Sequence, residues 1–444
     1  MLRKFIAVMA ISVLALQMMA EEDLLLSRSM NADEFNDFKE RVGIAVANHP
    51  SYKSSEASLR AAYAQIKGTK SALMPQIQLI LDSKNAVSRK YANDPTNFVE
   101  RSRSDHKTNA RFTLNQLLYD FGATQYEISR SEALSKASRA ELSNTIQELL
   151  YASIRSYIDV ASYRTFQDVV ESSYKRHQII KERIEQRVNS GMAAGRELSR
   201  AQAREAEALA KLTSVRQNLG VAISRFRIYF PEGDLPEKLP SYPSSLNDRN
   251  LNESRDAMFA NNPNILQANE EFIASTYKTK STDASSLPRL DLELTKTHYN
   301  ITKESDEFDT FAGINLSYDI YNGGRSEAFK EQSRAEEEAS LNSRDALIQS
   351  LLAELKESLR NLKLLPERLE AYKNAYVANK QSQFYAEKEF ESSNALLLDL
   401  LQTERDFLDA SESLIETFRT AEIQKYTYLQ LTGELGQTFE VILQ

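Results

Sequence analysis

Hydrophobic and polar residues alternate along one short stretch of the second half of the chain. Ala312, Ile314, Leu316, Tyr318 and Ile320 fall on one face, and the residues between them are glycine, asparagine, serine and aspartate. A period of two is typical of a β-strand with one apolar and one polar side. We therefore expect an amphipathic strand that continues to Ile320.

The residues after this strand predict a tight turn into a very long helix. Asn322, Gly323 and Gly324 accept positive φ angles. From Arg325 onward charged residues and alanines follow a helical spacing, with no glycine or proline before Pro366, where we expect a kink. A strand that turns directly into a long helix is thus predicted here.

An internal repeat relates the two halves of the chain. Residues 47–50 (Ala-Asn-His-Pro) recur at residues 260–263 (Ala-Asn-Asn-Pro), an offset of 213. After the strands the offset is 202, and Tyr-Asp-Phe-Gly122 matches Tyr-Asn-Gly-Gly324. Each repeat predicts, in order, a helix, a strand, a loop, a strand, a long helix, a short turn and a helix.

These patterns divide the chain into segments. In the first repeat roughly Ala32 to Leu73 is expected to be one helix, which Pro75 ends because proline disfavours helical geometry in the residue before it. The predicted segments are a signal peptide at 1–20, an N-terminal segment and helix at 21–74, a β-hairpin at 75–121, a helical hairpin at 122–229, a proline-rich crossover at 230–251, the helix of the second repeat at 252–287, a second β-hairpin at 288–322, a second helical hairpin at 323–431 and a C-terminal tail at 432–444.

The four strands are long enough to cross a membrane, which needs about 9–11 residues per tilted strand. Four strands cannot close into a barrel, and an open edge in lipid leaves backbone groups unpaired. Copies from other chains would close it, and three chains would give twelve strands around a lumen. A sandwich with one solvated face is the alternative. The side chains expected to face the lumen are polar or charged: Arg111, Asn115, Asp291, Glu293, Asn315 and Asp319.

The composition indicates that the protein is exported and argues against several functions. Residues 1–20 combine Arg3 and Lys4 with a twelve-residue apolar run, as in a secretory signal; an uncleaved anchor would need about 20 apolar residues. Its removal would change the net charge from −8 to −10 (−8 minus two basic residues), which does not favour nucleic-acid binding. The sequence contains no cysteine, its four histidines are scattered, and it has no phosphate-binding glycine motif, so we expect neither enzyme activity nor a cofactor or metal site.

The duplicated Asn-x-Pro, the Leu-Met-Pro75 and Ser-Leu-Pro288 helix-to-strand breaks, and the Tyr-Asp-Phe-Gly122 and Tyr-Asn-Gly-Gly-Arg325 turns together resemble the TolC family of outer-membrane channel proteins. The resemblance extends from about Asn31 to Gly433. It implies a mixed fold of helices and transmembrane strands: a homotrimer whose twelve-stranded barrel in the outer-membrane lipid continues as a helical coiled-coil tunnel through the periplasm.

The resemblance also implies roles for particular residues. The tips of the two helical hairpins would close the tunnel and contact an adaptor, and Asp399 would narrow the entrance. At the position of the family's second acidic residue this chain has Gln402. Glu404 is nearby but does not align with that position, and we interpret it as a solvated side chain. The tip residues are Gly191, Met192, Ser393 and Asn394. The entrance residues are Asp399, Gln402 and Glu197. The strand-to-helix turns contain Tyr119, Gly122, Tyr321, Gly323 and Gly324.

The function implied is passive exit of substrates that an inner-membrane ABC transporter or proton-driven pump delivers through a periplasmic adaptor (membrane fusion protein). Type I protein secretion and small-molecule efflux both use such ducts, and the missing lipid-anchor cysteine favours secretion. A periplasmic adaptor or a structural coiled-coil protein of the cell envelope is the alternative. The two hairpins and the amphipathic strands favour the channel.

Overall fold

The structure is a computed structural model that describes residues 30–91, 94, 96, 98–101, 106–242, 246, 248–303, 307–392 and 396–440. The predicted signal peptide lies outside these residues. The chain divides into two compact units. Unit 1 contains the described parts of residues 1–54, 143–263 and 349–444, and unit 2 contains those of residues 55–142 and 264–348.

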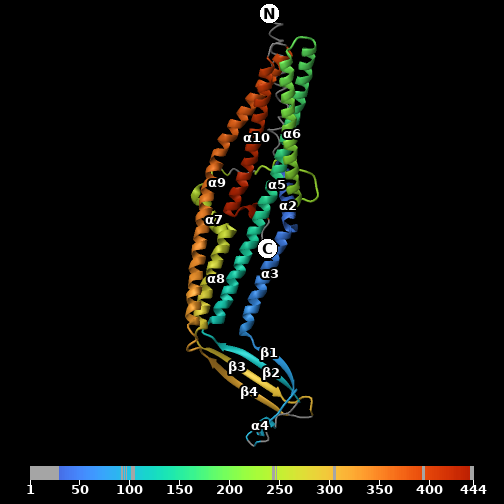
Figure 1. The fold of residues 1–444 in the computed structure, drawn as a ribbon. Helices are drawn as coiled ribbons and strands as arrows, with labels where there is room; N and C mark the ends of the chain where they lie inside the picture. Colours follow the sequence, from blue (N-terminus) through green and yellow to red (C-terminus); the bar gives the residue numbers. More distant parts are fainter. Residues whose placement is uncertain are drawn as a thin grey trace. The chain divides into compact units, whose positions relative to one another are not determined.

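Both halves of the chain show the same order of main elements (Figure 1): two helices, two strands, a 67-residue helix and a shorter helix. The first half contains α2 (Ala32–Asn48), α3 (Pro50–Lys70), η1 (Ser71–Leu73), β1 (Gln76–Asn85), α4 (Phe98–Arg101), β2 (His106–Tyr119), α5 (Ala123–Asn189) and α6 (Gly195–Tyr229). The second contains α7 (Leu251–Asn261), α8 (Pro263–Ser285), β3 (Arg289–His298), β4 (Phe308–Ser317), α9 (Arg325–Glu391), α10 (Leu397–Thr432) and α11 (Leu435–Thr438).

The helix expected over Ala32 to Leu73 is interrupted, which corrects the sequence prediction. Helix α2 ends at Asn48, and His49 is extended, with φ −69° and ψ 137°. Asn262 is extended in the same way between α7 and α8. In both places a proline follows, and its ring excludes the helical conformation from the residue before it. The repeated Asn-x-Pro therefore divides each helical segment in two.

Helices α5 and α9 are each about 100 Å long at the usual rise per residue. Helix α9 continues through Pro366. Both helices contribute residues to the two units. Helices of this length bury one stripe of apolar residues against neighbouring helices.

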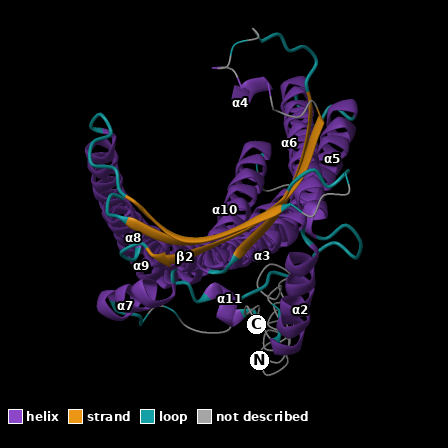
Figure 2. Ribbon diagram, turned by 90° about the horizontal axis from the view of Figure 1, so that it is seen from below, coloured by secondary structure: helices purple, strands orange, loops and turns teal. Residues whose placement is uncertain are grey.

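In unit 2 the four strands form one curved antiparallel sheet in the order β1-β2-β3-β4 (Figure 2). The register pairs Leu79 with Phe112, and Leu292 with Ile314. Since directly opposed residues share a face, the apolar positions of neighbouring strands meet on one side. Strands β1 and β4 are the edges of this sheet.

Strand β4 ends at Ser317, so the prediction that it continues to Ile320 was wrong. Ser317 pairs with Arg289, the first residue of β3. The next position of β3 would be Pro288, which has no N–H group to donate to the ladder. The alternation of apolar and polar side chains continues beyond Ser317, but no residue of β3 is left there to pair with the chain.

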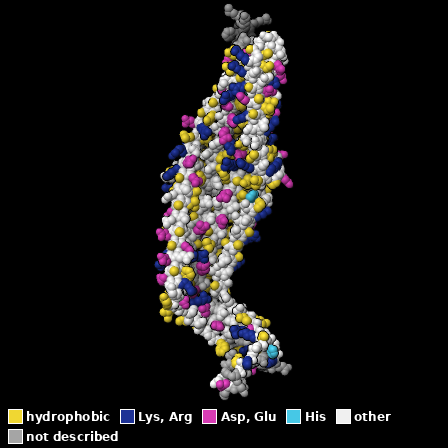
Figure 3. Space-filling view, in the orientation of Figure 1, with side chains coloured by type: hydrophobic (Ala, Val, Ile, Leu, Met, Phe, Trp, Pro, Cys, Tyr) yellow, Lys and Arg dark blue, Asp and Glu magenta, His cyan; other side chains and the backbone are white. Residues whose placement is uncertain are grey.

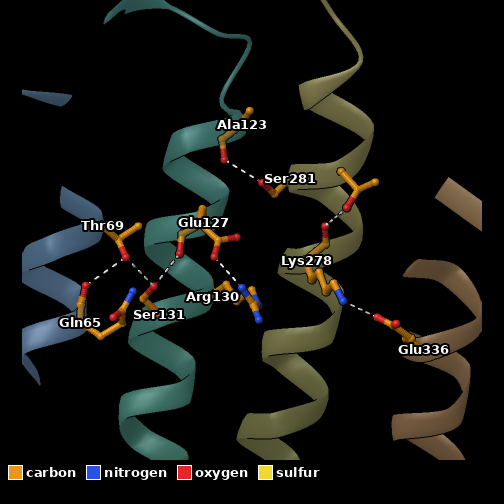
Figure 4. Close-up of polar contacts among 10 residues, drawn as sticks. Gln65, Thr69, Ala123, Glu127, Arg130, Ser131, Lys278, Ser281 and Glu336 are labelled. Carbon is orange, nitrogen blue, oxygen red and sulfur yellow. Dashed lines mark hydrogen bonds and ion pairs between the residues drawn. The ribbon is translucent and has the colours of Figure 1, made fainter. Parts of the chain in front are cut away.

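The helices of unit 2 are linked by polar contacts just beside the sheet (Figure 4). The hydroxyls of Thr69 on α3 and Ser131 on α5 lie 3.0 Å apart. The Ser281 hydroxyl on α8 donates to the Ala123 carbonyl at the start of α5 (3.0 Å), and Lys278 pairs with Glu336 of α9. These contacts join all four helices that lead into or out of the strands.

In unit 1 an aromatic cluster anchors the crossover between the repeats. Phe38 of α2 packs edge-on against Tyr157 of α5 at 4.7 Å, and Phe226 of α6 stacks on Phe230 at 4.6 Å. The buried Tyr426 of α10 donates a hydrogen bond to the Pro240 carbonyl (3.1 Å). A side chain from α10 thus helps to hold the described part of the proline-rich segment.

Candidate functional site

The turn between α5 and α6 is a tight loop that a glycine makes possible. Gly191 has a φ of +75°, and the amides of Met192 and Ala193 both donate to the Arg187 carbonyl (2.8 and 3.2 Å). The Met192 side chain is 76% exposed. The corresponding tip residues of the other hairpin, Ser393 and Asn394, lie outside the described residues.

The three predicted entrance residues lie near the starts of α6 and α10. Glu197 and Asp399 each occupy the first helical turn, where a carboxylate is favoured by the helix dipole by about 0.3–1 kcal/mol. Asp399 and Gln402 are exposed and lie three residues apart on one face. The Gln402 amide donates to Asp406 (2.8 Å), which fixes its side chain along the helix.

A hydrophobic cluster holds the two hairpins together behind these residues. It joins α5, α6, α9 and α10, and we call it the tip cluster; its members are Ile180, Ile184, Ala201, Phe390, Leu397, Leu400 and Leu401. Leu397, Leu400 and Leu401 point inward from the same turns that expose Asp399 and Gln402. A second group, the middle cluster, lies further from the tips and contains Phe166, Val170, Leu212, Val215 and Ile415.

Between the two clusters lies a buried ion pair that the sequence interpretation missed. Glu404 was interpreted as solvated, yet it is 1% exposed, so that interpretation was wrong. Its two carboxylate oxygens accept from Arg176 Nε at 3.0 and 2.8 Å, and one also accepts from Gln383 Nε2 at 2.7 Å. The signal was the helical spacing: Glu404 follows Leu400 and Leu401 by four and three residues and therefore shares their buried face.

The first strand-to-helix turn is organised by a carboxylate. Asp120 accepts hydrogen bonds from the amides of Gly122 (3.1 Å) and Thr124 (2.8 Å) and so caps α5. Phe121 and Gly122 both have positive φ angles, 56° and 88°. Tyr119 is exposed and packs against the Phe121 ring at 4.8 Å. Phe121 therefore holds a left-handed conformation that is unfavourable for a residue with a side chain.

The second turn uses glycines in the same places. Gly323 and Gly324 have φ angles of 71° and 84°. Asn322 replaces the carboxylate: its side chain accepts from the Ser326 amide (3.3 Å) and donates to the Ser326 hydroxyl (2.7 Å). Tyr321 is exposed. Both predicted turns are therefore real turns, in which a capping side chain and two left-handed residues redirect the chain into a helix.

The sheet collects most of the predicted lumen residues on one face. Asn115 pairs with Glu293, and Asp291 pairs with Asn315, so these four share a face with Arg111, which lies four residues before Asn115 on β2. Asp291 also accepts from Arg289 (2.9 Å). Asp319 does not belong to this group, because β4 ends two residues earlier.

The opposite face of the sheet exposes large apolar side chains. Ile77 is 63% exposed and Ile314 67% exposed, and the other members are Leu79, Leu81, Phe112 and Leu316. A contiguous exposed apolar face of this kind marks a surface that contacts lipid or another protein. One side of the sheet is thus predominantly polar, with Ile80 and Phe311 as its exposed apolar exceptions, and the other side is predominantly apolar.

The described part of the chain offers little else for chemistry. Within it, no group of three or more histidine, aspartate or glutamate side chains could hold a metal ion. On the face drawn in Figure 3, acidic and basic side chains are interspersed along the helices, unlike the clustered basic face of nucleic-acid-binding proteins.

None of the described helices is both long enough and apolar enough to span a membrane.

A family model described as "Outer membrane efflux protein" matches residues 42–226 and 255–434. Among characterised relatives, the outer membrane efflux protein BepC of Brucella suis is 22% identical over 397 residues, which cover 88% of this chain and 84% of that protein. The outer membrane protein TolC of Salmonella enteritidis is 22% identical over 404 residues, which cover 86% of this chain and 77% of TolC.

Solved structures with the same fold include two outer-membrane proteins. The CmeC outer membrane channel of Campylobacter jejuni superimposes with a TM-score of 0.79 at 14% identity, covering 89% of this chain and 85% of CmeC. The outer membrane protein VceC of Vibrio cholerae gives a TM-score of 0.77 at 15% identity, covering 90% of this chain and 96% of VceC.

Proposed function

Because the chain belongs to the outer membrane efflux protein family, we propose that it assembles with two further copies of itself into a channel through the outer membrane of a Gram-negative bacterium. The channel gives passive exit to substrates that an inner-membrane transporter delivers through a periplasmic adaptor. No step of this function requires chemistry by the protein.

The single observation that carries the proposal is the sheet of unit 2. Its apolar face is exposed while its other face is polar, and β1 and β4 have no neighbour on their outer sides within the described chain. In lipid, each unpaired backbone group costs several kcal/mol, so only a closed barrel is stable there. Three chains with four strands each would close a barrel of twelve strands, with the apolar face outward and the polar face around water.

We assign the far ends of the helical hairpins to the entrance and to adaptor contact. The exposed Met192 beside Gly191 offers an apolar anchor for a partner, and Ser393 and Asn394 would form the matching tip. Asp399, Gln402 and Glu197 would surround the entrance, where carboxylates from three copies attract cations.

Neighbouring residues on opposite faces of β4 provide the test. Ile314→Lys puts a charge on the proposed lipid face, and Asn315→Lys puts the same charge on the proposed lumen face. At mid-membrane depth a lipid-facing lysine costs about 2–4 kcal/mol. We expect Ile314→Lys to abolish the oligomer that resists dodecyl sulfate before heating, and Asn315→Lys to keep it and change its ion selectivity in planar bilayers.

Two results would refute the proposed channel. One is a wild-type protein that runs as a monomer on the gel without heating and conducts no ions. The other is equal tolerance of lysine at positions 314 and 315, since a sheet with both faces in water would not distinguish them.

A further inference from the structure

A layer of polar side chains crosses the bundle of unit 1 between its two hydrophobic clusters. The polar layer consists of Ser173, Arg176, His177, Gln383 and Glu404. Along α5 it lies between Val170 of the middle cluster and Ile180 of the tip cluster, and along α10 it lies between Ile415 and Leu401. Buried polar groups are costly unless they are fully hydrogen-bonded, so this layer contributes less to packing than the two hydrophobic clusters.

The ion pair between Arg176 and Glu404 leaves His177 without a hydrogen bond at one ring nitrogen. The His177 side chain is 8% exposed, and its Nδ1 atom has no hydrogen-bond partner among the described residues. On the same face of α5, Ser173 Oγ and Arg176 Nη2 also lack a partner within the described chain. A neutral imidazole tolerates this site better than an imidazolium, which must donate from both nitrogens.

Charged groups on α5, α6 and α10 act on His177. Arg176 lies on α5, Arg204 and Glu207 on α6, and Glu404 on α10. On α9, Gln383 of the layer donates to the carboxylate of Glu387 at 3.5 Å. Burial lowers the pKa of His177, and the opposing attraction of Glu404 is the smaller effect.

We propose that His177 is a proton-binding site whose occupation loosens the ends of the two helical hairpins. The inference rests on the proposed channel only for its physiological meaning, which is an entrance that widens in acid. The physical claim concerns the packed bundle alone: a proton on His177 favours the separated arrangement of α5, α9 and α10 over the packed one.

The direction follows from linkage. A histidine whose pKa is lowered in the packed state stabilises that state fully above its ordinary pKa of about 6.5, and the contribution is lost as the pH falls from there through the lowered pKa. At a pH below both pKa values, each unit of difference between them changes the equilibrium between the packed and the separated helices about tenfold. Acid therefore shifts the bundle toward separation.

The geometry explains why Glu404 does not neutralise this effect. Its carboxylate already accepts two contacts from Arg176 and one from Gln383. An imidazolium at position 177 must compete with Arg176 for those oxygens or remain unpaired beside two guanidinium groups. Either outcome weakens the contact that ties α5 to α9 and α10, only one turn from Leu400 and Leu401.

The test measures amide hydrogen exchange of the full-length assembled protein between about pH 7.5 and pH 5.5, corrected for the intrinsic effect of pH on exchange. In the wild type we expect peptides covering residues 170–184 and 397–410 to lose protection several-fold on acidification. His177→Gln should abolish that change. His49→Gln is the matched control, because His49 belongs to the same unit but stacks on Tyr229, outside the layer, and should keep it.

A second measurement needs no variant and therefore covers the case in which His177→Gln does not assemble. Exchange of the imidazole C2 hydrogen, followed by mass spectrometry across pH, reports the titration of His177 directly. A midpoint below about 6.5 supports the proposal. A midpoint at or above that value, or an acid-induced loss of protection that is the same in wild type and His177→Gln, overturns it. Neither readout depends on transport, so failure here is distinct from failure of the proposed channel.

Discussion

At Gly433, which ends α10, the structure leaves no room for a side chain. This glycine has a φ of +75° and ends the helix in a left-handed cap, with its amide directed to the carbonyls of Leu429 and Gln430. A Cβ atom at this position would lie 2.3 Å from the carbonyl oxygen of Asn261, at the end of α7. The adjacent Asn262 donates to the Leu431 carbonyl at 2.8 Å, so the two backbones are fastened together and cannot separate freely.

The cost of Gly433→Ala has two parts. A residue with a side chain in the left-handed region costs about 1–2 kcal/mol. Overpacking against a backbone that must shift adds about 1–3 kcal/mol, because the obstructing atoms belong to the main chain of Asn261 rather than to a flexible side chain. Together these give about 2–5 kcal/mol. For a chain of 444 residues this corresponds to a fall of about 2–5 °C in the midpoint of thermal unfolding.

Gly220→Ala is the matched control. Gly220 lies inside α6, and a Cβ atom there would meet nothing within 4 Å. The same substitution should therefore stabilise the protein by about 0.5–1 kcal/mol. Both variants are heated in detergent at one scan rate, with circular dichroism at 222 nm and the fraction of oligomer as readouts. Equal midpoints for the two variants would refute the assignment of a close backbone contact at Gly433.

Two further predictions concern the hairpin ends. Glu404→Leu leaves Arg176, whose side chain is only 24% exposed, without its carboxylate partner and should cost about 1.5–3 kcal/mol. Arg176→Met combined with Glu404→Leu should recover most of that loss. Thermal midpoints of the single and double variants measure these effects, and a double variant as unstable as the sum of the singles would contradict the argument. Asp399→Ala should reduce cation preference in planar bilayers, while Asp409→Ala, which removes the same charge further along α10, should not; equal effects would exclude Asp399 from the entrance.

The positions of the sheet residues could be predicted from the sequence because a strand exposes its pattern directly. With a period of two, Asn115 and Phe112 must lie on opposite faces whatever the rest of the fold does. The turns were equally readable, since Gly323 and Gly324 supply positive φ angles. In each case the structure depends on the side-chain alternation or the φ angles of a few neighbouring residues.

The misses depend on residues that are distant in the sequence. The end of β4 is set by Pro288 on the partner strand, and the burial of Glu404 is completed by Arg176, 228 residues earlier. Charge alone suggested a solvated glutamate, and only the helical stripe that it shares with Leu400 and Leu401 indicated otherwise. The interruption at His49 is the exception, because its cause is the next residue, Pro50, and is therefore visible in the sequence.

The two free edges of the sheet have a consequence for mixed populations of chains. In a ring built from identical links, each member must accept a neighbour on its β1 side and offer β4 to the next. A chain in which one edge strand cannot pair still joins a neighbour through its other edge strand. The assembly that contains it then stops before the barrel closes. If the proposed ring forms, defects confined to either border strand should accordingly be dominant over the normal copy when both are expressed.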